Sequence, residues 1–199
     1  MSDVYIIGSY STRFQKWPNK SFKDLSRDAY LGALDDSGLD DGGDIDIAYF
    51  GNCGLGTFGQ PCIRGQVCFT PLVQEGLFPE RVPTVNVEDA CATSSVAMNG
   101  AWKDILSGQS HLAIAMGVEK TYVPDDPAAT MELFAGGIDQ LDPEVWQTHY
   151  REQGEAMGKP FETGPGRTIF MDTYAMQASH HMKKWGTTQK QIAVGAAKN

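Results

Sequence analysis

The sequence predicts an α/β layered domain with a mostly parallel sheet, and two observations support this fold class. Short apolar runs alternate with helical patterns along the first 120 residues. The runs are almost wholly apolar, which is typical of strands covered on both faces. Such alternation indicates βαβ units with helices packed on the sheet. At 199 residues the chain is long enough for one sizeable core.

The strands and helices follow from periodicity and from the residues that end each run. A short apolar run closed by Gly8 predicts a buried opening strand. A glycine-rich loop follows the second strand, and the helix after the third strand is rich in small residues. In chain order we predict strands at 4–7, 45–50, 82–87 and 111–118, and helices at 22–37, 61–73, 91–107 and 169–185.

Two capping boxes mark where helices begin. Ser21 with Asp24 precedes the first helix, and Gly38 is a suitable stop for it. Thr188 with Gln191 forms the second box, ahead of a last helix. We therefore expect these two helix starts to be set locally.

The composition changes after residue 120, where prolines, a Gly-Gly pair and weak periodicity indicate an excursion from the core. We predict a core at 1–120, an inserted loop domain at 121–168 and a return to the core at 169–199. Four aromatic side chains of this region form either a large hydrophobic pocket or the loop's own small core: Phe134, Trp146, Tyr150 and Phe161.

The charge and the cysteines narrow the classes of function. With 16 Lys plus Arg against 25 Asp plus Glu, the net charge is -9, which disfavours a general grip on nucleic acid or an anionic membrane. We expect no secretory signal and no membrane span. Four cysteines without a C-x-x-C pair predict a reducing, cytoplasmic setting and no metal site.

Cys91 is the candidate nucleophile. It lies where a buried strand runs through a tight turn into a helix, the placement seen in nucleophile elbows. Unpaired N–H groups at a helix N-terminus favour thiolate over thiol and can hold an oxyanion. A single cysteine is more often a small buried hydrophobe, so the turn and the small neighbouring residues carry this prediction.

The remaining chemistry-bearing residues have simpler interpretations. Cys53, Cys62 and Cys68 are predicted to be core or helix-face thiols. His180 and His181 are adjacent on a helix and face different directions, so we expect a solvated face and not one shared site. Glu119 either orients a catalytic group or is a structural carboxylate.

The region around Cys91 resembles the nucleophile region of the thiolase superfamily. That pattern is Asn, a short gap, Cys-Ala-[Ser/Thr]-Gly-Ser, small residues, Ile-x-x-Gly, and an apolar strand into Gly-Gly-x-Glu. The tail resembles the archaeal and sterol-carrier-protein branch, and the chain is also similar to a thiolase for aromatic acyl-CoA. The matching segments are Val85-Asn86, Cys91-Ala-Thr-Ser-Ser95, Ile105-Leu-Ser-Gly108, Ala113-Ile-Ala-Met-Gly-Val-Glu119, Gly59-Gln60 with Arg64, Tyr174-Ala175, Lys184-Trp-Gly-Thr-Thr188, Gln191-Ile-Ala193 and Lys198-Asn199.

The resemblance implies a layered thiolase-like fold and an acyltransferase. In such an enzyme Cys91 attacks a 3-oxoacyl-CoA and keeps the acyl group as a thioester until CoA removes it; the reverse is a Claisen condensation. The Cys91 N–H contributes to the oxyanion hole. No permanent cofactor is implied, because coenzyme A is a substrate. The loop domain would bind CoA. The candidate residues for contacting the CoA phosphates are Arg151, Lys159, Arg167 and Lys183, with Lys120 and Lys184 as further candidates.

The resemblance also implies partners and leaves alternatives open. Members of this branch act as dimers and pair with a small zinc-ribbon and OB-fold subunit, and the groups that move protons belong to a C-terminal half outside these residues. Ser94 stands where the family most often has Gly, and Val118 replaces the second Gly of Gly-Gly-x-Glu. The alternatives are a ketoacyl-synthase-type condensing enzyme and a non-catalytic, thiolase-like subunit that binds acyl-CoA or scaffolds a complex.

Overall fold

The computed structural model describes residues 3–124, 126–162 and 169–198. The chain forms two compact units. The first unit runs to Leu133 and the second starts at Phe134. Within the described ranges, no helix is both long and apolar enough to cross a membrane.

The first unit is built on a three-stranded parallel sheet. Its strands are β1 (Ile47–Gly51), β2 (Thr84–Val87) and β3 (Ala113–Gly117), in the order β2-β1-β3. In the register, Gly51 of β1 lies opposite Val87 and Gly117. Because the strands are parallel, the residues that follow all three meet at one edge of the sheet.

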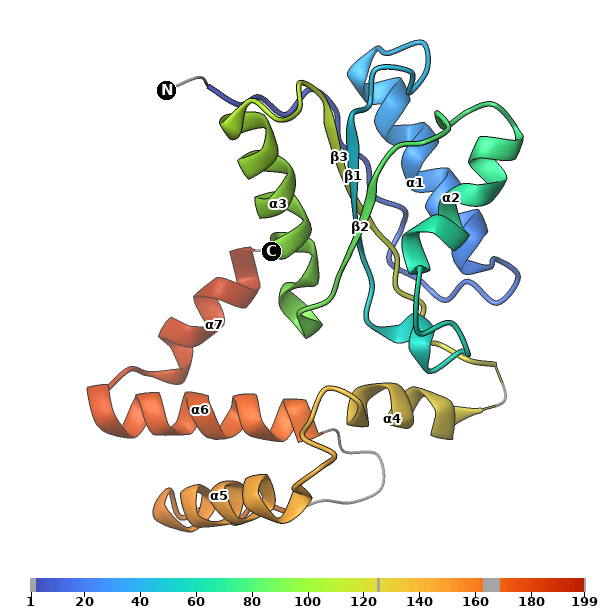
Figure 1. The fold of residues 1–199 in the computed structure, drawn as a ribbon. Coiled ribbons are helices and arrows are strands. Elements are labelled where there is room, and N and C mark those ends of the chain that lie inside the picture. The colour runs from blue at the N-terminus through green and yellow to red at the C-terminus, as the bar shows by residue number, and fades with distance from the viewer. Residues whose placement is uncertain (1–2, 125, 163–168, 199) are drawn as a thin grey trace. The chain divides into compact units, whose positions relative to one another are not determined.

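Helices cover both faces of this sheet (Figure 1). The helices α1 (Phe22–Ser37) and α2 (Arg64–Gln74) pack on each other and on one face. The helix α3 (Thr93–Ser107) packs on β1 and β3 from the other face. The predicted α/β fold, with a parallel sheet between helical layers, is confirmed.

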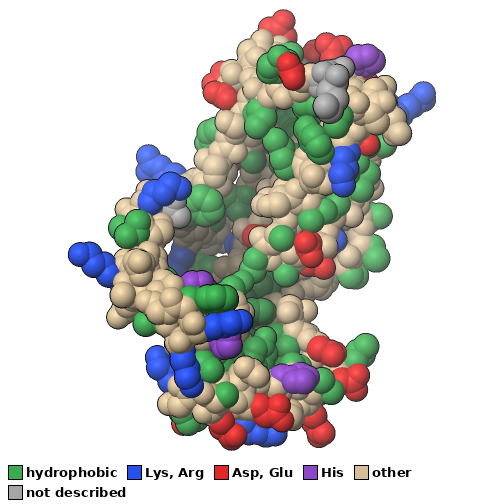
Figure 2. All heavy atoms as spheres, turned by 90° about the vertical axis from the view of Figure 1, so that its left-hand side faces the viewer, with side chains coloured by type: hydrophobic (Ala, Val, Ile, Leu, Met, Phe, Trp, Pro, Cys, Tyr) green, Lys and Arg blue, Asp and Glu red, His purple; other side chains and the backbone are tan. Residues whose placement is uncertain are grey.

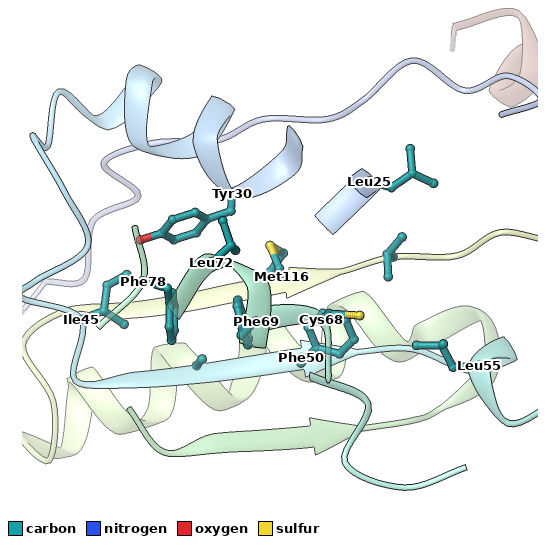
Figure 3. Close-up of a cluster of buried hydrophobic side chains, with 12 residues drawn as sticks. Leu25, Tyr30, Ile45, Phe50, Leu55, Cys68, Phe69, Leu72, Phe78 and Met116 are labelled. Atoms are coloured by element: carbon teal, nitrogen blue, oxygen red, sulfur yellow. The ribbon is translucent and has the colours of Figure 1, made fainter. Parts of the chain in front are cut away.

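The core lies between the sheet and the α1–α2 layer. Tyr30, Phe50 and Leu72 are fully buried there. Phe69 connects two of the aromatic rings: its centroid lies 5.6 Å from that of Phe50 and 4.3 Å from that of Phe78. Figure 3 shows these side chains gathered above β1. Aromatic burial of this kind provides most of the stabilisation in a small core.

Local signals set the ends of α1 as predicted. The Ser21 side chain accepts the N–H of Asp24, the Asp24 carboxylate accepts the N–H of Ser21, and Gly38 ends the helix at a φ of 71°. The left-handed conformation at Gly38 carries no Cβ penalty.

The predicted opening strand at residues 4–7 is wrong. The segment has no regular structure, and Tyr5, Ile6 and Ile7 are 74%, 71% and 52% exposed. The residues that follow it contact α1, where the N–H of Ser9 donates to Asp36 Oδ2 at 2.7 Å. Among the described residues it pairs with neither edge strand of the sheet, and an apolar run by itself does not specify a pairing partner.

Smaller differences concern where elements begin. α2 starts at Arg64, after Ile63 in the left-handed region at a φ of 46°, and not at residue 61. A 3₁₀ turn, η2 (Ala90–Ala92), precedes α3, so Cys91 lies just before the helix and not in it. Another 3₁₀ turn, η1 (Gly54–Gly56), interrupts the glycine-rich loop after β1.

The segment predicted as a loop contains two helices, α4 (Pro127–Ala135) and α5 (Pro143–Ala156). Its prolines are compatible with helices, because Pro127 and Pro143 stand at helix starts, where proline has a suitable φ and no N–H is missed. The helix boundaries therefore correct the loop interpretation, while the division at residues 120 and 168 stays a prediction.

Two further helices complete the second unit, α6 (Ile169–Trp185) and α7 (Gln189–Lys198). α6 has the predicted bounds and contacts α5. The second capping box is confirmed, since Thr188 N–H donates to Gln191 Oε1 at 2.7 Å and Gln191 N–H to Thr188 Oγ1 at 3.3 Å.

Candidate active site

Cys91 lies in η2, between the end of β2 and the first residue of α3. It is exposed and lines a cavity of about 720 Å³ in the first unit. No side chain caps the N-terminus of α3. An accessible thiol beside uncapped helix N–H groups, in a cavity of this size, can attack a bound electrophile and leave room for its acyl group.

The turn that carries Cys91 is unusual at the residue before it. Ala90 has a φ of 43°, in the left-handed region that residues other than glycine rarely adopt. Its N–H donates to Glu88 Oε1 at 2.6 Å, and its carbonyl accepts the Thr93 hydroxyl at 2.7 Å. The Thr93 hydroxyl also accepts the N–H of Asp89 at 2.8 Å. The turn is therefore held by side chains on either side of Cys91.

A second thiol, Cys53, lines the same cavity. Its Sγ lies 3.2 Å from the carbonyl oxygen of Ala90 and 3.0 Å from Thr93 Oγ1. Burial raises the pKa of the Cys53 thiol, so at neutral pH it is protonated and can donate a hydrogen bond.

The prediction that Cys53 is a core or helix-face thiol is therefore wrong, whereas Cys68 is buried in the core as expected. Cys53 follows the carboxyl end of a parallel strand, where active sites of open α/β sheets lie. This position in the sequence indicates a place in the site and not in the core.

Glu119 follows β3 and ties that strand to the loop after β1. Its carboxylate accepts the N–H of Cys53 and, at 3.2 Å, that of Gly54. Although much of the residue remains open to the cavity, burial of its carboxyl raises the pKa of Glu119. These contacts support the structural interpretation of this carboxylate, which shapes the cavity by holding the loop.

Asn52 completes the connection between the strand ends. It is fully buried, its Nδ2 donates to the Val118 carbonyl at 2.6 Å, and its Oδ1 accepts the N–H of Leu55 at 2.9 Å. The guanidinium of Arg64 donates to the Asn52 carbonyl. The carboxyl ends of β1 and β3 are thus fixed relative to each other by buried polar contacts, which leave few alternative arrangements.

One wall of the cavity comes from a segment that carries no recognisable sequence motif. Residues 11–15 and Trp17 line it, together with residues 120–122 after β3. The Lys16 ammonium lies 4.5 Å from the centre of the Tyr122 ring, and Lys120 Nζ donates to the Lys20 carbonyl at 2.7 Å. Only the folded chain brings these segments together, and no local pattern marked them.

Three of the residues proposed to contact phosphate are engaged within the second unit. Arg151 donates to Thr148 Oγ1 at 3.2 Å, Lys159 to Ser179 Oγ at 3.2 Å, and Lys183 to the Ala156 carbonyl at 2.8 Å. Arg167 lies outside the described residues. In these contacts each of the three described cations donates to one neutral oxygen and not to a carboxylate. Their binding of the CoA phosphates stays a prediction.

The second unit has a groove of about 370 Å³ between α5 and α6. Both His180 and His181 line it, with His149 from the facing helix. Both histidines are exposed, as predicted for a solvated face, although both also line this groove. Among the described residues, no group of three or more His, Cys, Asp or Glu side chains could hold a metal ion.

The aromatic side chains of the second unit pack on one another. The Tyr150 ring centre lies 6.0 Å from that of Trp146 and 5.4 Å from that of Phe161, and the Phe134 ring lies 6.1 Å from that of Phe170. These contacts favour a small core of the unit itself.

The sequence of the chain is similar to those of known proteins. The model of the thiolase N-terminal domain matches residues 4–159. An acetyl-CoA acetyltransferase of Methanothermobacter thermautotrophicus is 33% identical over 98% of this chain and 43% of its own length. One from Methanocaldococcus jannaschii is 31% identical over 98% of this chain and 42% of its own.

A third relative is benzoylsuccinyl-CoA thiolase subunit BbsB of Thauera aromatica, which is 29% identical over 98% of this chain and 42% of its own length. The chain therefore spans less than half the length of the curated relatives it matches. Because the family model covers most of the chain, including the whole Cys91 turn and the sheet beneath it, the chain belongs to the thiolase family.

Proposed function

We propose that this chain is the nucleophile-bearing part of a thiolase-type acyltransferase. The observation that carries the proposal is an exposed cysteine at a strand-to-helix turn, facing a cavity large enough for an acyl group. Family membership and the names of the relatives support the same reaction class.

In the proposed reaction the Cys91 thiolate attacks the 3-keto carbon of a 3-oxoacyl-CoA. The bond between C2 and C3 breaks, the CoA-bearing fragment leaves as an enolate that takes up a proton, and the shortened acyl group stays on sulfur as a thioester. The thiolate of a second CoA then takes the acyl group and frees Cys91. Written in reverse, the same steps form a carbon–carbon bond.

The backbone N–H of Cys91 would stabilise the oxyanion formed at the acyl-enzyme step. The groups that accept and return protons are proposed to lie in a complementary C-terminal half of the enzyme. A homodimer and a small zinc-ribbon and OB-fold subunit remain proposals that rest on the family alone.

The first test compares two exposed thiols in one molecule. The purified chain is treated with limiting iodoacetamide, and tandem mass spectrometry of peptides measures alkylation of Cys91 and Cys62, which is also exposed. We expect Cys91 to react faster than Cys62, and acetyl-CoA to protect Cys91 alone. Equal rates without protection would contradict a nucleophilic Cys91 and favour a binding or scaffold subunit.

A second test follows the acyl group. Incubation with acetyl-CoA is expected to add one acetyl group to the intact mass, and Cys91→Ala is expected to abolish the adduct. Acetylation from an acyl carrier protein, without acetylation from acetyl-CoA, would instead indicate a ketoacyl-synthase-type enzyme.

A further inference from the structure

The backbone before Cys91 adopts a conformation that needs support. Ala90 is left-handed, at a φ of 43°, and its Cβ makes this conformation unfavourable. Strained residues of this kind persist only where surrounding contacts determine them, and they occur most often at functional sites. The contacts made by the Ala90 peptide groups therefore decide where the next residue, Cys91, presents its thiol.

The Ala90 carbonyl lies within hydrogen-bond distance of two side-chain donors from different parts of the chain. The Thr93 hydroxyl lies 2.7 Å from this oxygen and the Cys53 Sγ lies 3.2 Å from it. The two side chains also contact each other, with Sγ 3.0 Å from Oγ1. Together they form a small polar cluster beneath the turn.

Thr93 is placed firmly enough to act as an anchor. It is 7% exposed, and its γ-methyl packs on the last residue of β1, since a Cβ added to Gly51 would lie 2.8 Å from Thr93 Cγ2. Its hydroxyl is used twice, as acceptor from the Asp89 N–H and as donor to the Ala90 carbonyl. The hydroxyl thus closes the turn on both sides of Ala90.

Cys53 connects this cluster to a different strand. It lies two residues after the end of β1 and 37 residues before Ala90, and its own N–H donates to Glu119, which follows β3. Because burial raises its pKa, the thiol keeps its proton at neutral pH and remains a donor. Cys91 by contrast is exposed, so its direction depends on the backbone of the turn.

We propose that Thr93 and Cys53 are positioning residues, which hold the Ala90 carbonyl and so fix the orientation of the Cys91 thiol toward the cavity. This inference rests on the proposed function, because it assigns a purpose to the turn only if Cys91 reacts. It does not require either residue to touch the substrate.

The test measures the alkylation rate of Cys91 divided by that of Cys62 in the intact chain, so that each molecule contains its own reference thiol. Thr93→Val keeps the shape of the side chain and removes the hydroxyl. We expect the ratio to fall about tenfold, as for the loss of a well-formed buried hydrogen bond. Thr93→Ser restores the hydroxyl and should keep the ratio within about twofold of the unmodified chain.

Thr70→Val is the matched control. The Thr70 hydroxyl also donates to a backbone carbonyl, that of Gln66 at 2.7 Å, but inside α2. This variant loses a hydroxyl-to-carbonyl hydrogen bond of the same length, at an exposed position away from the turn, and its ratio should not change. Thermal unfolding of each variant shows whether the fold is retained.

Cys53→Ala provides a second measurement if Thr93→Val does not fold. It removes the other donor, and we expect the ratio to fall about threefold, since a thiol is a weaker donor than a hydroxyl. If the unmodified chain shows no excess reactivity at Cys91, the proposed function fails and there is nothing to position. If Cys91 is reactive and the folded variants keep the same ratio, the positioning role alone is overturned.

Discussion

The two units of this chain differ in what holds them together. The first has a sheet, three covering helices and a set of fully buried aromatic and aliphatic side chains. Among the described residues of the second, only Gly154 and Thr173 are buried. Apolar side chains of its helices stay exposed, among them Tyr174 at 53% and Trp185 at 65%. The first unit is stabilised by a core, the second mainly by local helix formation.

Exposed apolar surface also occurs in the first unit, on the face of α3 turned away from the sheet. Met98 and Trp102 are each 44% exposed there. Figure 2, which draws the side on which α3 lies in Figure 1, shows hydrophobic side chains open to solvent among charged ones. The difference between the units is therefore one of degree: the first buries one face of its helices thoroughly, the second buries little.

Removing an aromatic ring from the core of the first unit should give the largest loss of stability. A small loss would contradict the difference between the two units. Phe50→Ala deletes a fully buried side chain that packs edge-to-face on Phe69. We expect the free energy of unfolding of the first unit to fall by about 3–5 kcal/mol, because lost burial and an unfilled cavity add. Hydrogen exchange of β1 and α2 amides, measured by mass spectrometry, reports this local stability.

The matched change in the second unit is Phe161→Ala. Phe161 is only half-buried, although its ring lies 5.4 Å from that of Tyr150. We expect a loss of about 1 kcal/mol or less, confined to exchange in α5 and α6. Equal losses from both substitutions would show that the second unit has a core as important as that of the first.

The two capping boxes give a smaller and sharper contrast, because the same device starts one helix in each unit. Ser21→Ala removes the acceptor of the Asp24 N–H, and Thr188→Ala removes that of the Gln191 N–H. Each should cost about 1 kcal/mol of helix stability.

What differs is where each loss appears. Loss of the Ser21 cap should lower the unfolding free energy of the whole first unit, because α1 packs on α2 and the sheet. Loss of the Thr188 cap should raise exchange in α7 alone, since no residue of α7 is buried. Faster exchange across α5 and α6 in Thr188→Ala would contradict independent helices.

These contrasts also explain what could be predicted from the sequence. The capping boxes and Gly38 act over a few residues, so the start and end of α1 were predictable. The parallel sheet followed from apolar runs between helices, and Cys91 from its place between a strand and a helix. Each of these signals lies within one short segment.

Features that depend on approach between distant segments were not predictable. Cys53 reaches the Ala90 carbonyl across 37 residues of sequence, and the wall at residues 11–15 joins the cavity only in the folded chain. The run at 4–7 failed as a strand because an apolar pattern does not specify a partner. Pro127 and Pro143 do not distinguish a loop from a helix start, because proline both ends and begins helices.

The smallest expected effect concerns the protonation of Glu119, which follows β3 in the first unit. Burial raises the pKa of Glu119 above its ordinary value, so the folded protein binds the proton more tightly than the unfolded chain does. By linkage, this stabilising contribution is fully present below the ordinary glutamate value of about 4.3 and is lost as pH rises through the raised pKa.

Glu119→Gln removes this dependence and retains an oxygen that can accept the N–H of Cys53 and Gly54. We therefore expect the stability of the unmodified chain, relative to Glu119→Gln, to decrease as pH rises through that window, in urea unfolding followed by circular dichroism. Hydrogen bonds lower the pKa values of Asp24 and Asp46, so the stabilisation that these two carboxylates provide is lost only at lower pH. That loss is the same in the unmodified chain and in Glu119→Gln. A relative stability that rises with pH would instead mean that the ionised carboxylate, through its two backbone hydrogen bonds, holds the strand ends together.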